Sequence, residues 1–174
     1  MSAPAYCPFY CEENIWHLAA DPRVGEGTRR VLVISNPERR VALWNQRAGS
    51  DDDDGLVVWD YHVVLLCEMR VWDLDTTLGL PSPASVYFPH TFRGAPAPFA
   101  PQFRVMDAAE YRRVFASDRR HMREPGGGFV REPPAWPPIG EGHVLEQLID
   151  LAVPEPGVIV DLPGLVGLLK ATGE

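Results

Sequence analysis

The strongest strand pattern in the chain covers Leu56 to Cys67, and it limits the possible folds more than any other segment. The run is rich in valine and aromatic residues, which favour β-strands. A second run, Val71 to Asp75, follows after a short connection. Two strands joined so closely can only pair antiparallel, because a parallel pair needs a crossover of a dozen or more residues. The sequence therefore predicts an antiparallel sheet built around this pair.

Further short runs extend the predicted sheet. Val31 to Ser35 and Val41 to Trp44 flank Asn36-Pro37-Glu38-Arg39, which is typical turn sequence, so they predict a hairpin. Additional strands are predicted at Phe103 to Met106 and at Val158 to Val160. The stretch from Gly79 to Pro101 holds many prolines and aromatic residues and is predicted to be a long ordered loop.

Helices are predicted at four places. Cys11 to Ala20 has apolar residues at helical spacing after an acidic first turn, and Asp21-Pro22 ends it. Asp107 occupies the first position of a capping box and opens a helix that runs to about Ala116. The other two predicted helices cover residues 144–151 and 165–170. The predicted class is α+β, an antiparallel sheet with segregated helices.

Length and composition indicate one intracellular globular domain covering residues 1–174. Hydrophobic residues make up 45% of the chain, which is enough for a core. The formal net charge of −8 argues against a nucleic-acid surface, which needs a basic patch. No run approaches the roughly 20 apolar residues of a membrane span, and residues 1–10 lack the pattern of a signal peptide. The four aspartates at 51–54 are expected to form an exposed loop.

Three cysteines are present, and Cys11 has the most informative surroundings. An odd, low count in a reducing compartment indicates free thiols. Cys11 stands at the predicted start of a helix, where unpaired N–H groups and the positive end of the helix dipole favour a thiolate. The same N–H groups could hold an oxyanion. Cys11 is therefore a candidate nucleophile, and the alternative is a buried structural thiol.

A thiolate nucleophile needs a general base, and His62 is the candidate among five histidines. It lies within the apolar run, where a titratable ring needs a polar partner, and the alternative is a core histidine with satisfied hydrogen bonds. If Leu65 pairs with Arg70, position 62 lies opposite Asp73 on the same face of the sheet. A carboxylate there would orient the imidazole. In this register Asp75 shares the face but lies one pair further along, out of easy reach.

Several segments together resemble the protein N-terminal glutamine amidohydrolase family. The resemblance rests on Tyr10-Cys11-Glu12-Glu13-Asn14-Ile15-Trp16, Trp59-Asp60-Tyr61-His62-Val63-Val64-Leu65-Leu66, Asp73-Leu74-Asp75-Thr76, Phe115-Ala116-Ser117-Asp118-Arg119 with His121-Met122, and Arg131-Glu132-Pro133-Pro134. These segments follow the family's order to about residue 138, and the sequence beyond about Gly140 matches more loosely.

This resemblance implies a papain- or transglutaminase-like fold and a catalytic triad of Cys11, His62 and Asp73. The implied reaction converts an N-terminal glutamine of a protein or peptide to glutamate and ammonia through a thioester, without a metal or organic cofactor. In eukaryotes the new glutamate can be arginylated, which marks the protein for degradation by the N-degron route. The expected form is a monomer in the cytoplasm, with the nucleus as a second location.

Specificity for an N-terminal residue requires a group that binds the free α-ammonium. A buried cation needs a carboxylate or several carbonyl oxygens nearby. Glu12, Glu13 and Asp60 are the candidates because each adjoins a triad segment. Asp60 ranks first, since residues 60 and 62 of one strand share a face. In the alternative interpretation, the two glutamates only favour the start of the helix.

Three other functions remain open from the sequence. The chain could be another cysteine enzyme on this fold, such as a peptidase or a transglutaminase. It could be a metal-binding module that uses Cys7, Cys11, Cys67 and His62, although these spacings lack the short paired knuckles of zinc sites. It could also be a catalytically inactive protein that only binds N-terminal glutamine.

Overall fold

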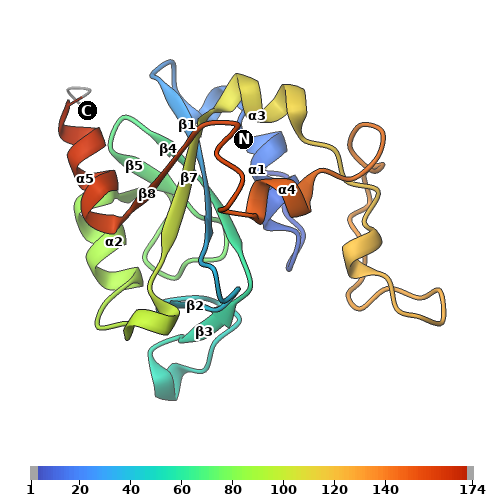
Figure 1. Ribbon diagram of the computed structural model, residues 1–174, viewed down its shortest axis with the longest axis horizontal. Helices are drawn as coiled ribbons and strands as arrows, with labels where there is room; N and C mark the ends of the chain where they lie inside the picture. The colour runs from blue at the N-terminus through green and yellow to red at the C-terminus, as the bar shows by residue number, and fades with distance from the viewer. Residues whose placement is uncertain (1–3, 172–174) are drawn as a thin grey trace.

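A computed structural model describes residues 4–171 of the chain. Its centre is an antiparallel sheet of six strands in the order β6-β5-β4-β1-β7-β8 (Figure 1). The strands of this sheet are β1 (Arg29–Ser35), β4 (His62–Cys67), β5 (Arg70–Trp72), β6 (Ser82–Pro83), β7 (Gln102–Asp107) and β8 (Val158–Asp161). Every described pair of neighbours is antiparallel, as the sequence predicted.

Helices cover both faces of the sheet (Figure 1). The helices α1 (Cys11–Leu18), α3 (Ala108–Val114) and α4 (Leu145–Ile149) pack on one face, and α2 (Ala84–Thr91) and α5 (Leu162–Ala171) pack on the other. Strand β1 alternates accordingly: Val31 and Val33 join the core under α1, whereas Leu32 and Ile34 join the core under α2. The α+β class is confirmed, and the helices are divided between two layers.

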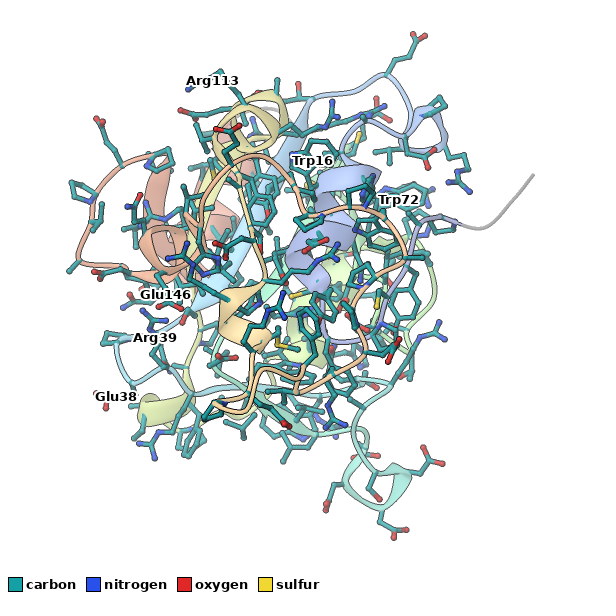
Figure 2. All side chains as sticks on the ribbon, turned by 90° about the vertical axis from the view of Figure 1, so that its right-hand side faces the viewer. Trp16, Glu38, Arg39, Trp72, Arg113 and Glu146 are labelled. Carbon is teal, nitrogen blue, oxygen red and sulfur yellow. The ribbon has the colours of Figure 1, made fainter. Side chains whose placement is uncertain are left out.

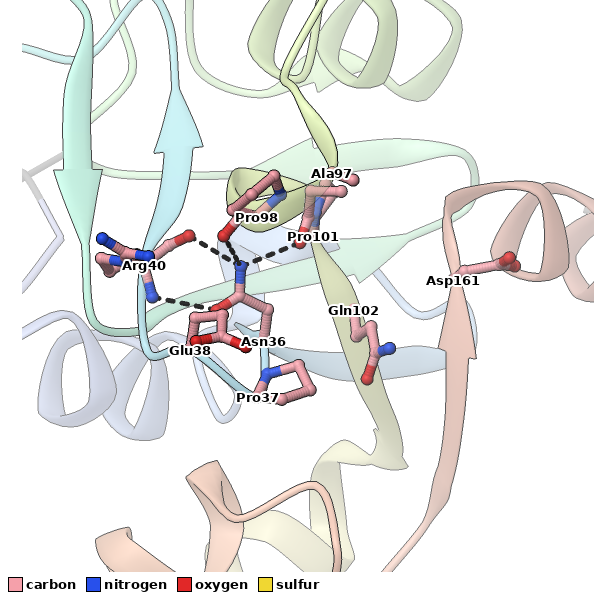
Figure 3. A pocket seen from close by; sticks show the side chains of 10 residues that line it. Asn36, Pro37, Glu38, Arg40, Ala97, Pro98, Pro101, Gln102 and Asp161 are labelled. Carbon is pink, nitrogen blue, oxygen red and sulfur yellow. Dashed lines mark hydrogen bonds between the residues drawn. The ribbon is translucent and has the colours of Figure 1, made fainter.

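The predicted hairpin between residues 31–35 and 41–44 is wrong. Both edges of β1 are already occupied, by β4 and by β7, so the next segment has no free edge to join. Instead, β2 (Val41–Leu43) pairs with β3 (Val57–Trp59) in a separate small sheet. The Asn36 side chain holds the turn before β2, because its Nδ2 donates to the carbonyls of Arg40, Pro98 and Ala100 (Figure 3).

The long apolar run at 56–67 is divided between the two sheets. Strand β3 ends at Trp59 and β4 begins at His62, so the chain leaves the small sheet and enters the large one at Asp60 and Tyr61. The Ser35 hydroxyl donates to the Asp60 carbonyl at 2.7 Å and holds this crossing point. The break also removes the argument that residues 60 and 62 share a face.

The predicted loop at 79–101 is also partly wrong, because it contains α2. Pro89 lies inside this helix, which is why the sequence pattern looked irregular. Packing of Tyr87 and Phe88 into the core stabilises the helix despite the proline. The cap predicted at Asp107 is confirmed, since its side chain accepts hydrogen bonds from the backbone of Ala109 and Glu110.

The remaining helices and turns lie close to their predicted places. Helix α1 ends two residues earlier than expected, α4 is shorter, and α5 begins earlier. Single 3-10 turns occur at Pro22–Val24, Asp51–Asp53, Ala97–Phe99 and Arg120–Met122, and the aspartates at 51–54 are exposed as predicted. Among residues 4–171, no helix combines the length and apolar character needed to cross a membrane.

Candidate active site

Cys11 is the first residue of α1 and is 8% exposed. No side chain caps this helix, so the N–H groups of its first turn are not occupied by a capping side chain. Acidic residues at positions 12 and 13 favour a helix start here, and Ile15 and Leu18 fix the helix against the sheet. The helix thereby presents the Cys11 thiol to a cavity of about 740 Å³.

His62 lines the same cavity and contacts Asp73. The His62 Nε2 and Asp73 Oδ1 atoms are 2.9 Å apart, and both side chains are buried. With Nε2 bonded to the carboxylate, Nδ1 is the ring nitrogen left to exchange a proton with a thiol. The structure therefore brings together the histidine and the aspartate that the sequence paired.

The strand register that led to this pair differs from the prediction by two residues. Leu65 pairs with Trp72, not with Arg70, because the connection is a two-residue turn at Glu68 and Met69, both with positive φ. A shift of two preserves the face of each side chain, so the expected contact survives. The ladder ends at Trp72, and Asp73 reaches His62 from the turn that follows β5.

Four donors surround the Asp73 carboxylate. Oδ1 accepts from His62 and from the Asp75 backbone, and Oδ2 accepts from Gln46 Nε2 at 3.1 Å and from the Tyr87 hydroxyl at 2.8 Å. Burial opposes ionisation, but the charge and hydrogen bond of His62, with the bond from Gln46, hold the pKa of Asp73 below its usual range. Burial likewise opposes protonation of His62, but the charge and hydrogen bond of Asp73 raise its pKa overall.

Burial and nearby carboxylates act on the Cys11 thiol in the opposite direction to the helix start. Burial raises the pKa of Cys11 well above its ordinary value, and the charges of Glu12, Asp75 and Asp73 raise it further. A hydrogen bond from the Val63 backbone acts in the opposite direction but is outweighed. The thiol is therefore activated only when a base takes its proton or when a cation offsets the surrounding negative charge.

The alkylation of Cys11 should reveal this electrostatic control. Glu12 Oε2 lies 3.7 Å from the Cys11 sulfur and is fully buried. We expect Glu12→Gln to lower the midpoint of the iodoacetamide rate–pH curve for Cys11, because the largest nearby negative charge is removed. Mass mapping of the labelled peptides separates Cys11 from Cys7 and Cys67. An unchanged or higher midpoint, with the exposed Glu141→Gln variant as control, would contradict this prediction.

Glu13 is engaged in a buried ion pair away from the cavity lining. Its two oxygens accept from Arg119 Nε and Nη2, each at 2.8 Å, and Oε2 also accepts from Trp136 Nε1 at 2.7 Å. These bonds join α1 to the segment at 117–136, so Glu13 is placed to stabilise the structure. Arg119 also donates to the Trp136 carbonyl at 2.8 Å, so it links both segments.

We expect Glu13→Gln to lower the free energy of unfolding by about 3–5 kcal/mol, since it leaves the buried Arg119 guanidinium without its counter-charge. Denaturant unfolding of both proteins measures this difference. The exposed ion pair of Arg39 with Glu146, labelled in Figure 2, is the matched control. Breaking it with Glu146→Gln should cost at most about 1 kcal/mol. Equal costs for the two variants would contradict the structural role of Glu13.

The other two candidates for ammonium binding lie in different surroundings. Glu12 is fully buried behind the nucleophile, where Oε2 accepts from the Tyr61 hydroxyl at 3.0 Å and Oε1 lies 3.4 Å from His121 Nε2. Asp60 lines the cavity but is exposed, and its Oδ1 accepts from the Tyr61 backbone. Glu12 thus faces the protein interior and Asp60 the rim.

Asp75 is a site residue that the sequence argument set aside. It lines the cavity with Cys11 and His62, and one of its oxygens lies within 4.8 Å of ligand atoms on both His62 and Asp73. Gln46 and Tyr87 were missed as well: Gln46 lies between the predicted segments, and Tyr87 lies in the stretch that was predicted to be a loop. The acidic Asp73-Leu74-Asp75 spacing was the available signal, and only the correct register shows that both carboxylates approach the histidine.

The predicted alternative metal site is not assembled. Among residues 4–171, the side chains close enough to share one ion are His62, Asp73 and Asp75, and no cysteine belongs to this group. The Nε2 of His62 and both oxygens of Asp73 are already hydrogen bonded within the protein. Cys7 contacts the Glu132 carbonyl, at 3.6 Å from its sulfur. The proposed set of three cysteines and His62 is therefore not brought together.

A cysteine at a helix start, a histidine in the same cavity and a buried aspartate on that histidine are the components of a thiol-dependent hydrolase. Comparison with known proteins identifies the family. The sequence model for N-terminal glutamine amidase matches residues 6–167, and the chain belongs to this family. The match continues well beyond residue 140, further than the sequence segments had indicated.

Named relatives agree with this assignment. The chain is 41% identical to the protein N-terminal glutamine amidohydrolase of Arabidopsis thaliana over 167 residues, which cover 84% of this chain and 75% of the relative. It is 40% identical to the protein of the same name in Drosophila melanogaster over 179 aligned positions, which cover 93% of this chain and 86% of the relative.

Proposed function

We propose that this chain hydrolyses the side-chain amide of an N-terminal glutamine, with Cys11 as nucleophile, His62 as general base and acid, and Asp73 as the orienting carboxylate. The observation that supports it best is the 2.9 Å contact between His62 and Asp73 beside the cavity that holds Cys11, in a chain of this family. The reaction needs no cofactor. We also propose that the active form is a monomer.

The first half of the reaction forms a thioester. His62 Nδ1 takes the Cys11 proton, and the thiolate forms a bond to the carbonyl carbon of the glutamine side chain. The N–H groups at the start of α1, including that of Cys11, hold the oxyanion. As the carbon–nitrogen bond breaks, the His62 imidazolium gives its proton to the departing nitrogen, which leaves as ammonia. Asp73 keeps the ring oriented and stabilises its charged form.

The second half regenerates the thiol. A water molecule attacks the thioester carbonyl while neutral His62 takes one of its protons. The carbon–sulfur bond then breaks, the proton returns to Cys11, and an N-terminal glutamate is released. A papain- or transglutaminase-like arrangement is consistent with this order of events, because the helix of the nucleophile packs against the strand of the histidine. The free thiols of the chain suit the reducing cytoplasm.

Three peptides test the proposal: one that begins with glutamine, one that begins with asparagine, and one with glutamine only at an internal position. We expect ammonia release and an amide-to-acid mass shift for the first peptide alone. Comparable release from the internal glutamine would favour a broader amidase, and a new amide bond to an added amine would favour a transglutaminase. Peptide cleavage would favour a peptidase. Binding without any ammonia release would leave the inactive binding protein as the function.

A further inference from the structure

Asp75 is held at the cavity by the turn that follows β5. Its backbone N–H donates to Asp73 Oδ1 at 2.9 Å, and its carbonyl accepts from the Arg47 N–H at 2.8 Å. These two bonds fix the backbone on either side of the carboxylate. The side chain lines the same cavity as Cys11 and His62, so it faces the place where the substrate reacts.

The carboxylate of Asp75 has fewer partners than that of Asp73. Tyr6 donates its hydroxyl to Oδ1 at 2.7 Å. Within residues 4–171, no ion pair to Asp75 is formed and no donor hydrogen bonds to its Oδ2. A half-buried carboxylate with one free oxygen, beside a second carboxylate, is an electrostatically unfavourable arrangement unless a cation is supplied. Burial and the charge of Asp73 raise the pKa of Asp75, and the charges of His62 and Arg47 with the hydrogen bond from Tyr6 offset this only in part.

We infer that Asp75 binds the α-ammonium group of the substrate and so selects an N-terminal glutamine over an internal one. This inference rests on the proposed function. In glutamine, four bonds separate the α-nitrogen from the side-chain carbonyl carbon, so a side chain that extends to Cys11 leaves its ammonium elsewhere in the same cavity. An ammonium–carboxylate hydrogen bond in this partly buried place is charge-assisted and strong. An internal glutamine has an uncharged amide nitrogen there and leaves Asp75 unpaired.

Binding of the ammonium also activates the nucleophile. Asp75 is among the charges that raise the pKa of Cys11 and that of His62. A cation bound to Asp75 offsets this charge, so the thiol loses its proton more easily and the imidazole is more readily neutral. Substrates without the ammonium therefore lose both an anchor and this activation. Glu12 is too deeply buried for this task, and the exposed Asp60 would bind an ammonium more weakly because water screens it.

Kinetic measurements of each enzyme variant on two substrates test the inference. The two substrates are a glutamine-initiated peptide and the same peptide beginning with 4-carbamoylbutanoyl, which is glutamine without its α-amino group. We expect Asp75→Asn to lower kcat/KM for the glutamine peptide about 100-fold. For the peptide without the amine, kcat/KM should change less than about threefold or increase, so the preference for the amine is lost. Asp60→Asn should retain the preference, and the exposed Asp53→Asn should match the unmodified protein.

The alkylation rate of Cys11 distinguishes the proposed role of Asp75 from a purely structural one. Asp75→Asn should make Cys11 react faster with iodoacetamide at neutral pH, while its turnover of the glutamine peptide falls. Tyr6→Phe provides a milder variant if Asp75→Asn folds poorly: it should lower kcat/KM for the glutamine peptide about five- to tenfold, and only for the substrate with the amine. Equal losses on both substrates, for either variant, would overturn the inference. Absence of turnover by the unmodified protein would instead overturn the proposed function.

Discussion

Replacing Cys11 by alanine is expected to abolish ammonia release from a glutamine-initiated peptide, with a fall in kcat on the order of a millionfold. The reason is that alanine leaves no atom able to form the thioester, so only transition-state binding by the helix start remains. Coupled detection of ammonia at high enzyme concentration measures the residual rate. A residual rate above about one part in a hundred of the unmodified protein's rate would show that Cys11 is not the nucleophile, because loss of a nucleophile lowers the rate far more than that.

Two controls separate loss of chemistry from loss of structure. Cys67 is buried in β4 outside the described lining of the cavity, so Cys67→Ala should retain turnover close to that of the unmodified protein. Cys11→Ala itself should unfold at an unchanged or slightly shifted temperature and should still bind the glutamine peptide. Its affinity for that peptide can be measured by calorimetry, since no reaction consumes the ligand.

Local patterns predicted the parts of the site that depend on one segment. Cys11 was recognisable because acidic residues follow it and apolar residues recur at helical spacing, which places it at a helix start. His62 was recognisable because a polar ring in an apolar strand needs a partner. The predicted contact between His62 and Asp73 is correct although the predicted register is wrong. The register error is two residues, and side chains two residues apart on a strand lie on the same face.

Features that depend on several segments could not be predicted in this way. Whether β2 pairs with β1 depends on β7 occupying the second edge of β1, and β7 lies some seventy residues away in sequence. Helix α2 has a proline inside it, and only core packing outweighs the local signal against a helix. The position of Asp75 beside His62 depends on the exact end of the β4–β5 ladder, which a single-sequence register argument does not determine.

The same limit applies to the ionisation of the Cys11 thiol. A helix start lowers a thiol pKa, and the sequence shows the helix start directly. The opposing effects come from burial and from carboxylates of two separate segments, Glu12 in α1 and Asp73 and Asp75 in the turn after β5. Carboxylates close to the sulfur are unfavourable for a free thiolate, but they suit a substrate that arrives with its own positive charge.

Replacing Asp73 by asparagine is expected to lower kcat about ten-thousandfold. An asparagine whose Nδ2 faces His62 Nε2 would move the ring proton to Nδ1, the atom that must accept the proton of Cys11. The flipped amide would instead point its NH2 group at two donors, Gln46 Nε2 and the Tyr87 hydroxyl. Either orientation impairs the base, so the loss should appear mainly in kcat.

The pH profile distinguishes this mechanism from simple destabilisation. Asp73 raises the pKa of His62, so Asp73→Asn should lower it and shift the acid limb of the kcat/KM profile to lower pH. Tyr87→Phe is the matched control, because it removes one donor to Asp73 and retains the charge; its loss should stay below about tenfold. Activity of Asp73→Asn within tenfold of the unmodified protein, or an unshifted acid limb, would show that His62 works without this carboxylate.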